Sequence, residues 1–103
     1  VRINWQPTAD AGGPYPTIVG APLTLDGSGS HDRGGDIRYY LWDLDGDGIH
    51  DDARGVTTTT TFAASGVHTI SLRVIDDDQA WDADTAVIHV VAGREHFLPL
   101  LRR

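Results

Sequence analysis

The stretch HTISLRVID, residues 68–76, alternates apolar and polar side chains with a period of two. Successive side chains of an extended strand point to opposite faces, so Ile70, Leu72 and Val74 share one face. The polar side chains between them share the other face. An antiparallel strand that packs one face on a core and exposes the other to water has this pattern. The stretch therefore predicts a half-buried strand and argues against a helix.

Shorter stretches with the same alternation recur along the chain. They are PLTLD (22–26), DIRYYLWDL (36–44), VTTTTTF (56–62) and DTAVIHVV (84–91), with an edge strand expected near Pro16–Val19. Clusters of glycine, aspartate and serine separate them, as turns require. Short strands at this spacing, with no helical periodicity, predict an all-β fold of two packed antiparallel sheets. Trp42 is expected at the centre of the core, because a large aromatic side chain in a middle strand can contact both sheets.

Composition narrows the class of protein further. The chain has 103 residues, which suits one domain with a single core. Its formal net charge of −7 argues against nucleic acid and anionic membranes, since both require a basic surface. No cysteine is present, which excludes disulfides and thiolate metal sites. No signal peptide or membrane-spanning run is recognisable, and because the chain begins with Val we expect a mature or excised piece of a larger precursor.

Four motifs occur in a characteristic order: ADAG at 9–12, LDGSGS at 25–30, SGVH at 65–68 and V-x-D-D at 74–77. Between the second and third, Trp42 and Asp43 are followed by a glycine–aspartate–glycine. Over residues 8–91 the chain resembles the PKD (polycystic-kidney-disease-type) domain family. The resemblance implies an immunoglobulin-like β-sandwich of about seven strands in an extracellular or cell-surface protein. It implies a spacer, adhesion or interaction module rather than an enzyme, and the long acidic WDLDGDG loop suggests a bacterial surface or secreted variant.

Some bacterial members of the family bind calcium, and the resemblance carries that site onto Asp32, Asp76 and Asp77 of this chain. Asn4 and Ser30 would be further candidates. The family's second acidic residue in the turn after the serine is replaced here by Gly34, so a structural turn is the favoured interpretation of this cluster.

The stretch WDLDGDGIHDD, residues 42–52, predicts a calcium site more directly. Asp43, Asp45 and Asp47 take positions 1, 3 and 5 of an EF-hand-type loop, and Gly48 takes position 6. The backbone carbonyl of Ile49 and the side chain of Asp51 would follow at positions 7 and 9, with Ile49 packing inward. Position 12 is Arg54, so the usual glutamate is missing and Asp52 is a candidate replacement. The alternative is an exposed turn, because aspartate and glycine are also frequent turn residues.

Other chemistry finds little support. The five histidines show no metal-ligand spacing, which argues against zinc. A small sandwich without a cleft argues against catalysis.

The domain division that we expect is a linker or edge segment at 1–10, the PKD-like sandwich at 11–92 and a C-terminal tail at 93–103. Apolar residues of the two ends, with one from the sandwich, could form a partner-binding patch. They are Trp5, Trp81, Phe97, Leu98, Leu100 and Leu101.

Three functions are consistent with these features. The first is a non-catalytic, calcium-stabilised structural or adhesion module. The second is a self-assembling surface subunit whose terminal segments dock on neighbouring copies, although the tail could instead be a sorting signal. The third is a carbohydrate-binding accessory module of a secreted hydrolase. That function needs coplanar exposed aromatic side chains, for which Tyr39 and Trp81 are the candidates.

Overall fold

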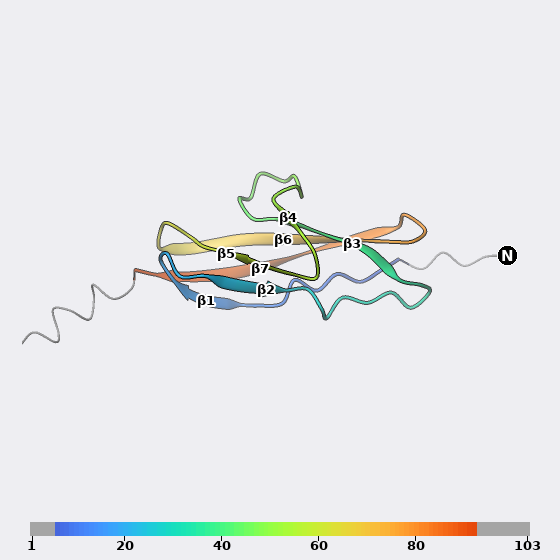
Figure 1. Cartoon of the computed structure of the whole chain (residues 1–103), viewed down its shortest axis with the longest axis horizontal. Coiled ribbons are helices and arrows are strands. Elements are labelled where there is room, and N and C mark those ends of the chain that lie inside the picture. The colour runs from blue at the N-terminus through green and yellow to red at the C-terminus, as the bar shows by residue number, and fades with distance from the viewer. Residues whose placement is uncertain (1–5, 93–103) are drawn as a thin grey trace, which may run out of the picture.

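The computed structural model describes residues 6–92, which form seven strands in two packed sheets (Figure 1). The predicted all-β sandwich is confirmed. The smaller sheet pairs β2 (Leu23–Asp26) with β5 (Thr57–Thr60). The larger sheet contains, in spatial order, β1 (Tyr15–Ile18), β7 (Trp81–Val91), β6 (Gly66–Asp76), β3 (Ile37–Asp43) and β4 (Ala53–Arg54).

The β6–β7 hairpin forms the centre of the larger sheet, with a continuous register from Ile75 opposite Trp81 to Gly66 opposite Val90. Ile70, Leu72 and Val74 are all buried, as the alternation in residues 68–76 predicts. Both strands begin earlier in the sequence than the alternation alone indicates, because the hairpin register extends pairing to their exposed ends. Strand β4 was not predicted, since its two residues show no alternation.

The core lies between the sheets around Trp42, which is 0% exposed. Its indole Nε1 donates a hydrogen bond of 2.8 Å to the carbonyl oxygen of Gly55. Gly27, in the LDGSGS motif, lies so close that a Cβ there would be 2.7 Å from Leu72 Cδ2 and 3.4 Å from Trp42 Cζ2. A glycine is therefore required at this position for the turn after β2 to pack on the core.

One strand pairing differs from the purely antiparallel arrangement that the sequence suggests. Strand β1 runs parallel to β7, with Tyr15 opposite Ile88 and Ile18 opposite Val91. A parallel pair needs a long connection between its strands. Strands β1 and β7 satisfy that requirement because they lie near opposite ends of the described chain, and local alternation carries no information about such a pairing.

The segment before β1 packs against the sandwich more closely than a linker would. Residues 7–11 alternate between buried and exposed, and Ala9 and Ala11 belong to the core. Their amides donate hydrogen bonds of 2.8 Å to the side chains of Asp82 and Asp84 on β7. The sequence pattern does not reveal this contribution to the core, because small alanines and a proline conceal the period of the segment. The predicted tail at 93–103 lies outside the described residues.

Replacement of Trp42 by phenylalanine should destabilise the fold by about 2 kcal/mol, through a lost hydrogen bond, an unpaired Gly55 carbonyl and a partly empty core. Chemical denaturation of the Trp42→Phe variant measures this change. Trp81→Phe is the matched control, because Trp81 is 49% exposed and its replacement should change stability by less than about 0.5 kcal/mol. Equal effects of the two substitutions would contradict the placement of Trp42 at the centre of the core.

Candidate metal centre

The acidic loop connects the buried end of β3 to β4 and projects from the larger sheet (Figure 1). The loop closes on Trp42, whose carbonyl oxygen accepts a hydrogen bond of 3.0 Å from the amide of Asp52. His50 Nε2 lies 2.8 Å from Ser71 Oγ on β6, which ties the middle of the return segment to the sheet. Both ends of the loop are therefore held by the sandwich.

Asp43 organises the first half of the loop. It is 4% exposed, and its two carboxylate oxygens accept hydrogen bonds of 2.9 Å from the amides of Gly46 and Gly48. Both glycines have a positive φ, +76° and +86°, which other residues rarely adopt. The two glycines of the DGDG sequence thus allow the backbone to curl so that two amides point at one carboxylate.

The other carboxylates continue this pattern of amide contacts. Asp52 Oδ2 accepts hydrogen bonds from the amides of Leu44, at 2.7 Å, and Asp45, at 3.2 Å. Asp45 Oδ1 accepts from the Asp47 amide at 3.2 Å, and Asp47 Oδ1 accepts from the Ile49 amide at 2.9 Å. Such Asx-turn contacts curl the chain without any ion. They also leave Asp45, Asp47 and Asp52 one further oxygen each.

The curled loop brings together one oxygen from each of four aspartates, all within 4.8 Å of one another. The four are Asp43, Asp45, Asp47 and Asp52. Asp51, which the EF-hand spacing places at position 9, is exposed and is not part of the group. The side chain of Ile49 is 59% exposed and does not pack inward as expected. Asp52 takes the place of Asp51 because the Asp52 amide donates a hydrogen bond to the Trp42 carbonyl just before β4, where the chain becomes extended. Adjacent side chains of an extended chain point in opposite directions, so Asp51 points away from the group.

The crowding of these carboxylates shifts their pKa values in opposite directions. Burial opposes ionisation of Asp43, but the amides of Gly48, Gly46 and Asp47, together with Asp45, lower the pKa of Asp43 overall. The Asp47 amide acts in the same direction on Asp45. Desolvation and the neighbouring carboxylates of Asp43 and Asp47 outweigh it and raise the pKa of Asp45 to about 6. Full ionisation of the loop is therefore opposed by repulsion between its carboxylates, and a bound cation would remove that repulsion.

The second predicted cluster is also assembled, at the opposite end of β3, where Ile37 pairs with Asp76. Single oxygens of Asp32, Asp76 and Asp77 lie within 4.8 Å of one another. Asp76 is buried, and its Oδ1 accepts hydrogen bonds from the amides of Asp78, at 2.8 Å, and Ala80, at 2.9 Å. These contacts serve the β6–β7 turn, as expected for a structural role.

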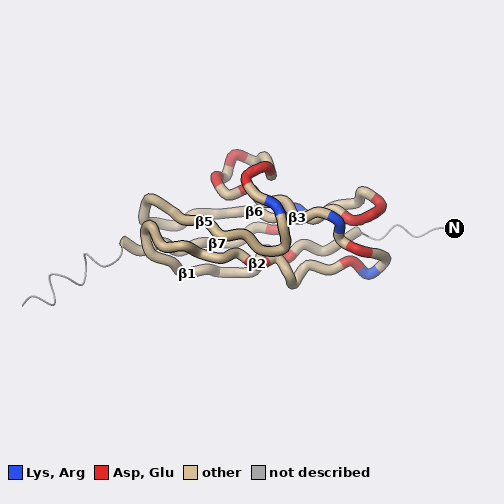
Figure 2. The backbone as a smooth tube through the Cα atoms, viewed as in Figure 1, with Lys and Arg blue, Asp and Glu red and all other residues tan. Residues whose placement is uncertain are grey.

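Asp32 is the member of this cluster whose contacts are incomplete. Its Oδ1 accepts a hydrogen bond of 2.9 Å from the Gly34 amide, whereas its Oδ2 is buried and has no partner. The Gly34 amide favours the ionised form, but burial and the carboxylates of Asp76 and Asp77 raise the pKa of Asp32 overall. Figure 2 shows acidic segments gathered both in the projecting loop and at the end of the sheet that contains this cluster.

The predicted partner-binding residues fall largely outside residues 6–92. Trp81 is the described member, at the exposed start of β7, with the guanidinium of Arg73 4.3 Å above its ring. Trp5, Phe97, Leu98, Leu100 and Leu101 lie outside the described residues, as does Asn4. Ser30 is described, but its Oγ accepts a hydrogen bond of 2.9 Å from the Asp10 amide, so it serves the N-terminal segment.

The geometry defines a small immunoglobulin-like sandwich with two carboxylate clusters, and comparison with known proteins identifies its family. The model of the PKD domain family matches residues 4–91. The chain belongs to the PKD domain family, whose members are modules of an extracellular type. No helix within residues 6–92 is long and apolar enough to cross a membrane.

The curated relatives are much longer than this chain. It is 38% identical over 95 residues to "Dyslexia-associated protein KIAA0319 homolog" of Rattus norvegicus, covering 85% of the chain and 9% of that protein. The Homo sapiens protein "Dyslexia-associated protein KIAA0319" is 38% identical over 94 residues, covering 84% of the chain and 9% of its own length. The chain thus corresponds to a small part of these relatives.

Two solved structures illustrate the shared fold. The PKD1 domain of Vibrio anguillarum Epp superposes with a TM-score of 0.72 at 23% identity, covering 88% of this chain and 100% of that one. A structure described as showing the basis of "the promiscuous specificity of the carbohydrate-binding modules from the beta-sandwich super family" has a TM-score of 0.74 at 28% identity. That match covers 89% of this chain and 37% of the other.

The raised pKa of Asp45 gives the stability of the folded chain a specific pH dependence. A carboxyl whose folded pKa lies near 6, above its unfolded value of 3.8, contributes stability that is fully present below 3.8. That contribution is lost as the pH rises through about 6. The melting temperature in calcium-free buffer should therefore rise between pH 7.5 and pH 5, and Asp45→Asn should reduce the slope. An unchanged slope in the variant would contradict the raised pKa of Asp45.

Proposed function

We propose that this PKD domain is a non-catalytic structural or adhesion module of an extracellular or cell-surface protein, stabilised by calcium at its acidic loop. The observation that carries the proposal is the convergence of Asp43, Asp45, Asp47 and Asp52 within 4.8 Å. Oxygen ligands of this kind suit calcium, which accepts six to eight oxygens in flexible geometry. Family membership and the extracellular type of PKD modules support the location.

The four carboxylates form a donor set that suits a calcium site of modest affinity. Four carboxylates supply enough negative charge, and backbone carbonyls or water would complete the coordination shell. The position that a bidentate glutamate occupies in an EF-hand is Arg54, which lies on β4 and is exposed. A site without that ligand suits the millimolar calcium concentrations outside cells, where modules with dissociation constants of about 10⁻⁴–10⁻³ M operate.

Calcium would act on the loop and through it on the sandwich. A bound ion would neutralise the repulsion that raises the pKa of Asp45. Because the loop ends are bonded to Trp42, ordering the loop would also hold β4 against β3 at Leu41 and Trp42. The role proposed for calcium is therefore mechanical: it stiffens one edge of a module that connects other parts of a longer protein. We further propose that the acidic loop distinguishes this chain as a bacterial surface or secreted variant of the PKD family.

At 10 mM, calcium should stabilise the folded chain by about 1.4–2.7 kcal/mol if the dissociation constant is about 10⁻³–10⁻⁴ M. This corresponds to a rise in melting temperature of roughly 6–20 °C for a domain of this size. Thermal melting in EDTA and in calcium measures the shift. A melting temperature that calcium leaves unchanged would contradict the proposal.

Neighbouring aspartates provide a matched pair of variants for the same measurement. Asp52→Asn and Asp51→Asn remove the same charge from adjacent positions, but only Asp52 belongs to the carboxylate group. The calcium shift should be largely lost in Asp52→Asn and retained in Asp51→Asn. The reverse result would mean that calcium binds Asp51, at position 9 of the EF-hand spacing, and not Asp52.

A carbohydrate-binding role is a second candidate, supported by the register of three strands. Tyr39 lies opposite Ile75, which lies opposite Trp81, so the three side chains share the outer face of the larger sheet. Tyr39 and Trp81 are 50% and 49% exposed. Tyr39 and the face of the Trp81 ring that Arg73 leaves uncovered could stack on sugar rings. The similarity to the structure of carbohydrate-binding modules is consistent with this role.

If this face binds sugar, the chain should be retained on insoluble polysaccharides such as cellulose or chitin. Trp81→Ala should reduce retention at least tenfold, whereas Val87→Ala, an exposed change farther along β7, should leave it unchanged. Pull-down assays with both variants provide the measurement. Failure of the wild-type chain to bind any such polymer would exclude this role, and it would not affect the calcium proposal.

A further inference from the structure

The outer edge of β3 is only partly covered in residues 6–92. Strand β6 pairs with β3 from Ile37 to Asp43, whereas β4 pairs with it only at Leu41 and Trp42. After β4 the chain leaves the larger sheet at Gly55 and continues into β5 of the smaller sheet. The stretch Ile37–Tyr39 therefore has a strand on one side and none on the other. An uncovered edge of this kind can pair with an extended segment of another chain.

A β-bulge changes which side chains accompany this edge. The β3–β6 register shifts between Ile37 and Tyr39, which makes Arg38 the extra residue. A bulge interrupts alternation, and Arg38 and Tyr39 are consequently both exposed although they are adjacent. Alternation then resumes, with Tyr40 partly buried and Trp42 buried. The bulge thus exposes the Arg38 side chain beside Tyr39 at this edge.

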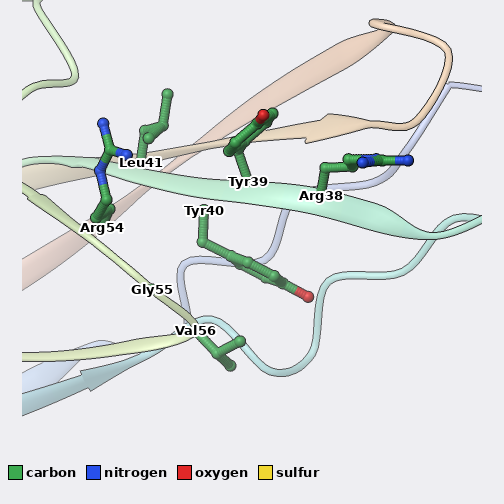
Figure 3. Close-up of a pocket in the computed structure, with 7 residues that line it drawn as sticks. All are labelled: Arg38, Tyr39, Tyr40, Leu41, Arg54, Gly55 and Val56. Carbon is green, nitrogen blue, oxygen red and sulfur yellow. The ribbon is translucent and has the colours of Figure 1, made fainter.

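A hollow of about 360 Å³ lies beside the edge, where the chain crosses between the sheets. Arg38 and Arg54 lie near its two ends, Tyr39 and Tyr40 project to opposite sides of β3, and Val56 lies across from Tyr40 (Figure 3). A strand added beside β3 would find apolar and aromatic surface in the middle and a guanidinium at each end. Peptides that extend a sheet bind through main-chain hydrogen bonds and pockets for alternate side chains.

The two arginines determine the charge of the occupant. Both are exposed, and neither guanidinium group has a hydrogen-bond or ion-pair partner among residues 6–92. They lie about three residues apart along β3, roughly 10 Å at 3.3 Å per residue. In a chain of net charge −7, they place two cations beside this edge, whose Ile37 end adjoins the carboxylates of Asp36 and Asp76. Carboxylates form strong bidentate hydrogen bonds with guanidinium groups, which makes acidic side chains the complementary partners.

We propose that the free edge of β3 binds an extended acidic peptide as an added strand, with Arg38 and Arg54 pairing with carboxylates of the peptide. The same charges disfavour pairing of two copies through this edge, because each copy would bring its own arginines against those of the other. The occupant is therefore an acidic segment of a different chain, or of another part of a longer protein, rather than the β3 edge of a second copy.

The test uses the full chain in calcium and an eight-residue peptide that alternates glutamate and valine. We expect saturable binding, with amide chemical-shift changes concentrated at residues 37–41 and 54–56. A peptide with alternate backbone amides N-methylated should bind at least tenfold more weakly, because it lacks main-chain donors. A peptide with lysine in place of glutamate should not bind. Equal binding of the methylated peptide would overturn strand addition, and absence of binding by the glutamate peptide would overturn the proposal.

Two double variants with equal net charge separate the role of the arginines from general electrostatics. Arg38→Ser/Arg54→Ser and Thr85→Glu/His89→Glu both make the chain more acidic by two charges, with histidine counted as neutral. The first should weaken peptide binding at least tenfold, and the second, on the exposed face of β7, by less than about twofold, reflecting screened long-range repulsion. Similar losses in both variants would overturn the assignment. Binding of polygalacturonate without binding of the peptide would overturn it in favour of an acidic-glycan site.

Discussion

Burial of Trp42 fixes the ends of the acidic loop. The backbone carbonyl of Trp42 accepts a hydrogen bond from the amide of Asp52, and the indole N–H of Trp42 donates one to the carbonyl of Gly55. A single core residue thus holds the return of the loop and the point where the chain crosses to the second sheet. Because the Trp42 side chain is fully buried, the position of both bonds depends on packing across the sandwich.

This anchoring explains how five aspartates can occupy eleven residues of a stable domain. Amides of the loop compensate much of the charge, and most directly that of Asp43. Asp45 is the residue at which compensation is insufficient, as its raised pKa shows. The loop is consequently held in a shape that its own charges oppose. A cation bound at this loop would add stability where the repulsion between carboxylates is greatest.

Local alternation predicts most of the sandwich but not all of its pairings. The two-residue alternation around Leu72 and around Trp42 identifies the central strands, because each of these strands buries one face on the core. The parallel pairing of β1 with β7 and the short strand β4 depend on contacts distant in sequence, which local patterns do not encode. The contribution of Ala9 to the core is concealed for a different reason, since small side chains give a weak hydrophobic signal.

The candidate site divides in a similar way. The 1-3-5 spacing and the glycines predict that Asp43, Asp45 and Asp47 converge, because these residues determine how the backbone curls. The fourth carboxylate follows instead from the pairing of the return strand, which selects Asp52 over Asp51. Composition likewise predicts an acidic protein but not the placement of Arg38 and Arg54 beside the β3 edge, which requires the bulge and the crossing between sheets.

A calcium titration of the full chain, followed by amide chemical shifts, distinguishes a calcium site in the acidic loop from a turn that binds no ion. We expect saturation with one ion, with the largest changes at the amides of residues 43–52 and at the indole N–H of Trp42. Changes that grow without saturation and spread over aspartates throughout the chain would contradict the calcium site. They would show that the curled loop is a turn maintained by its own hydrogen bonds alone.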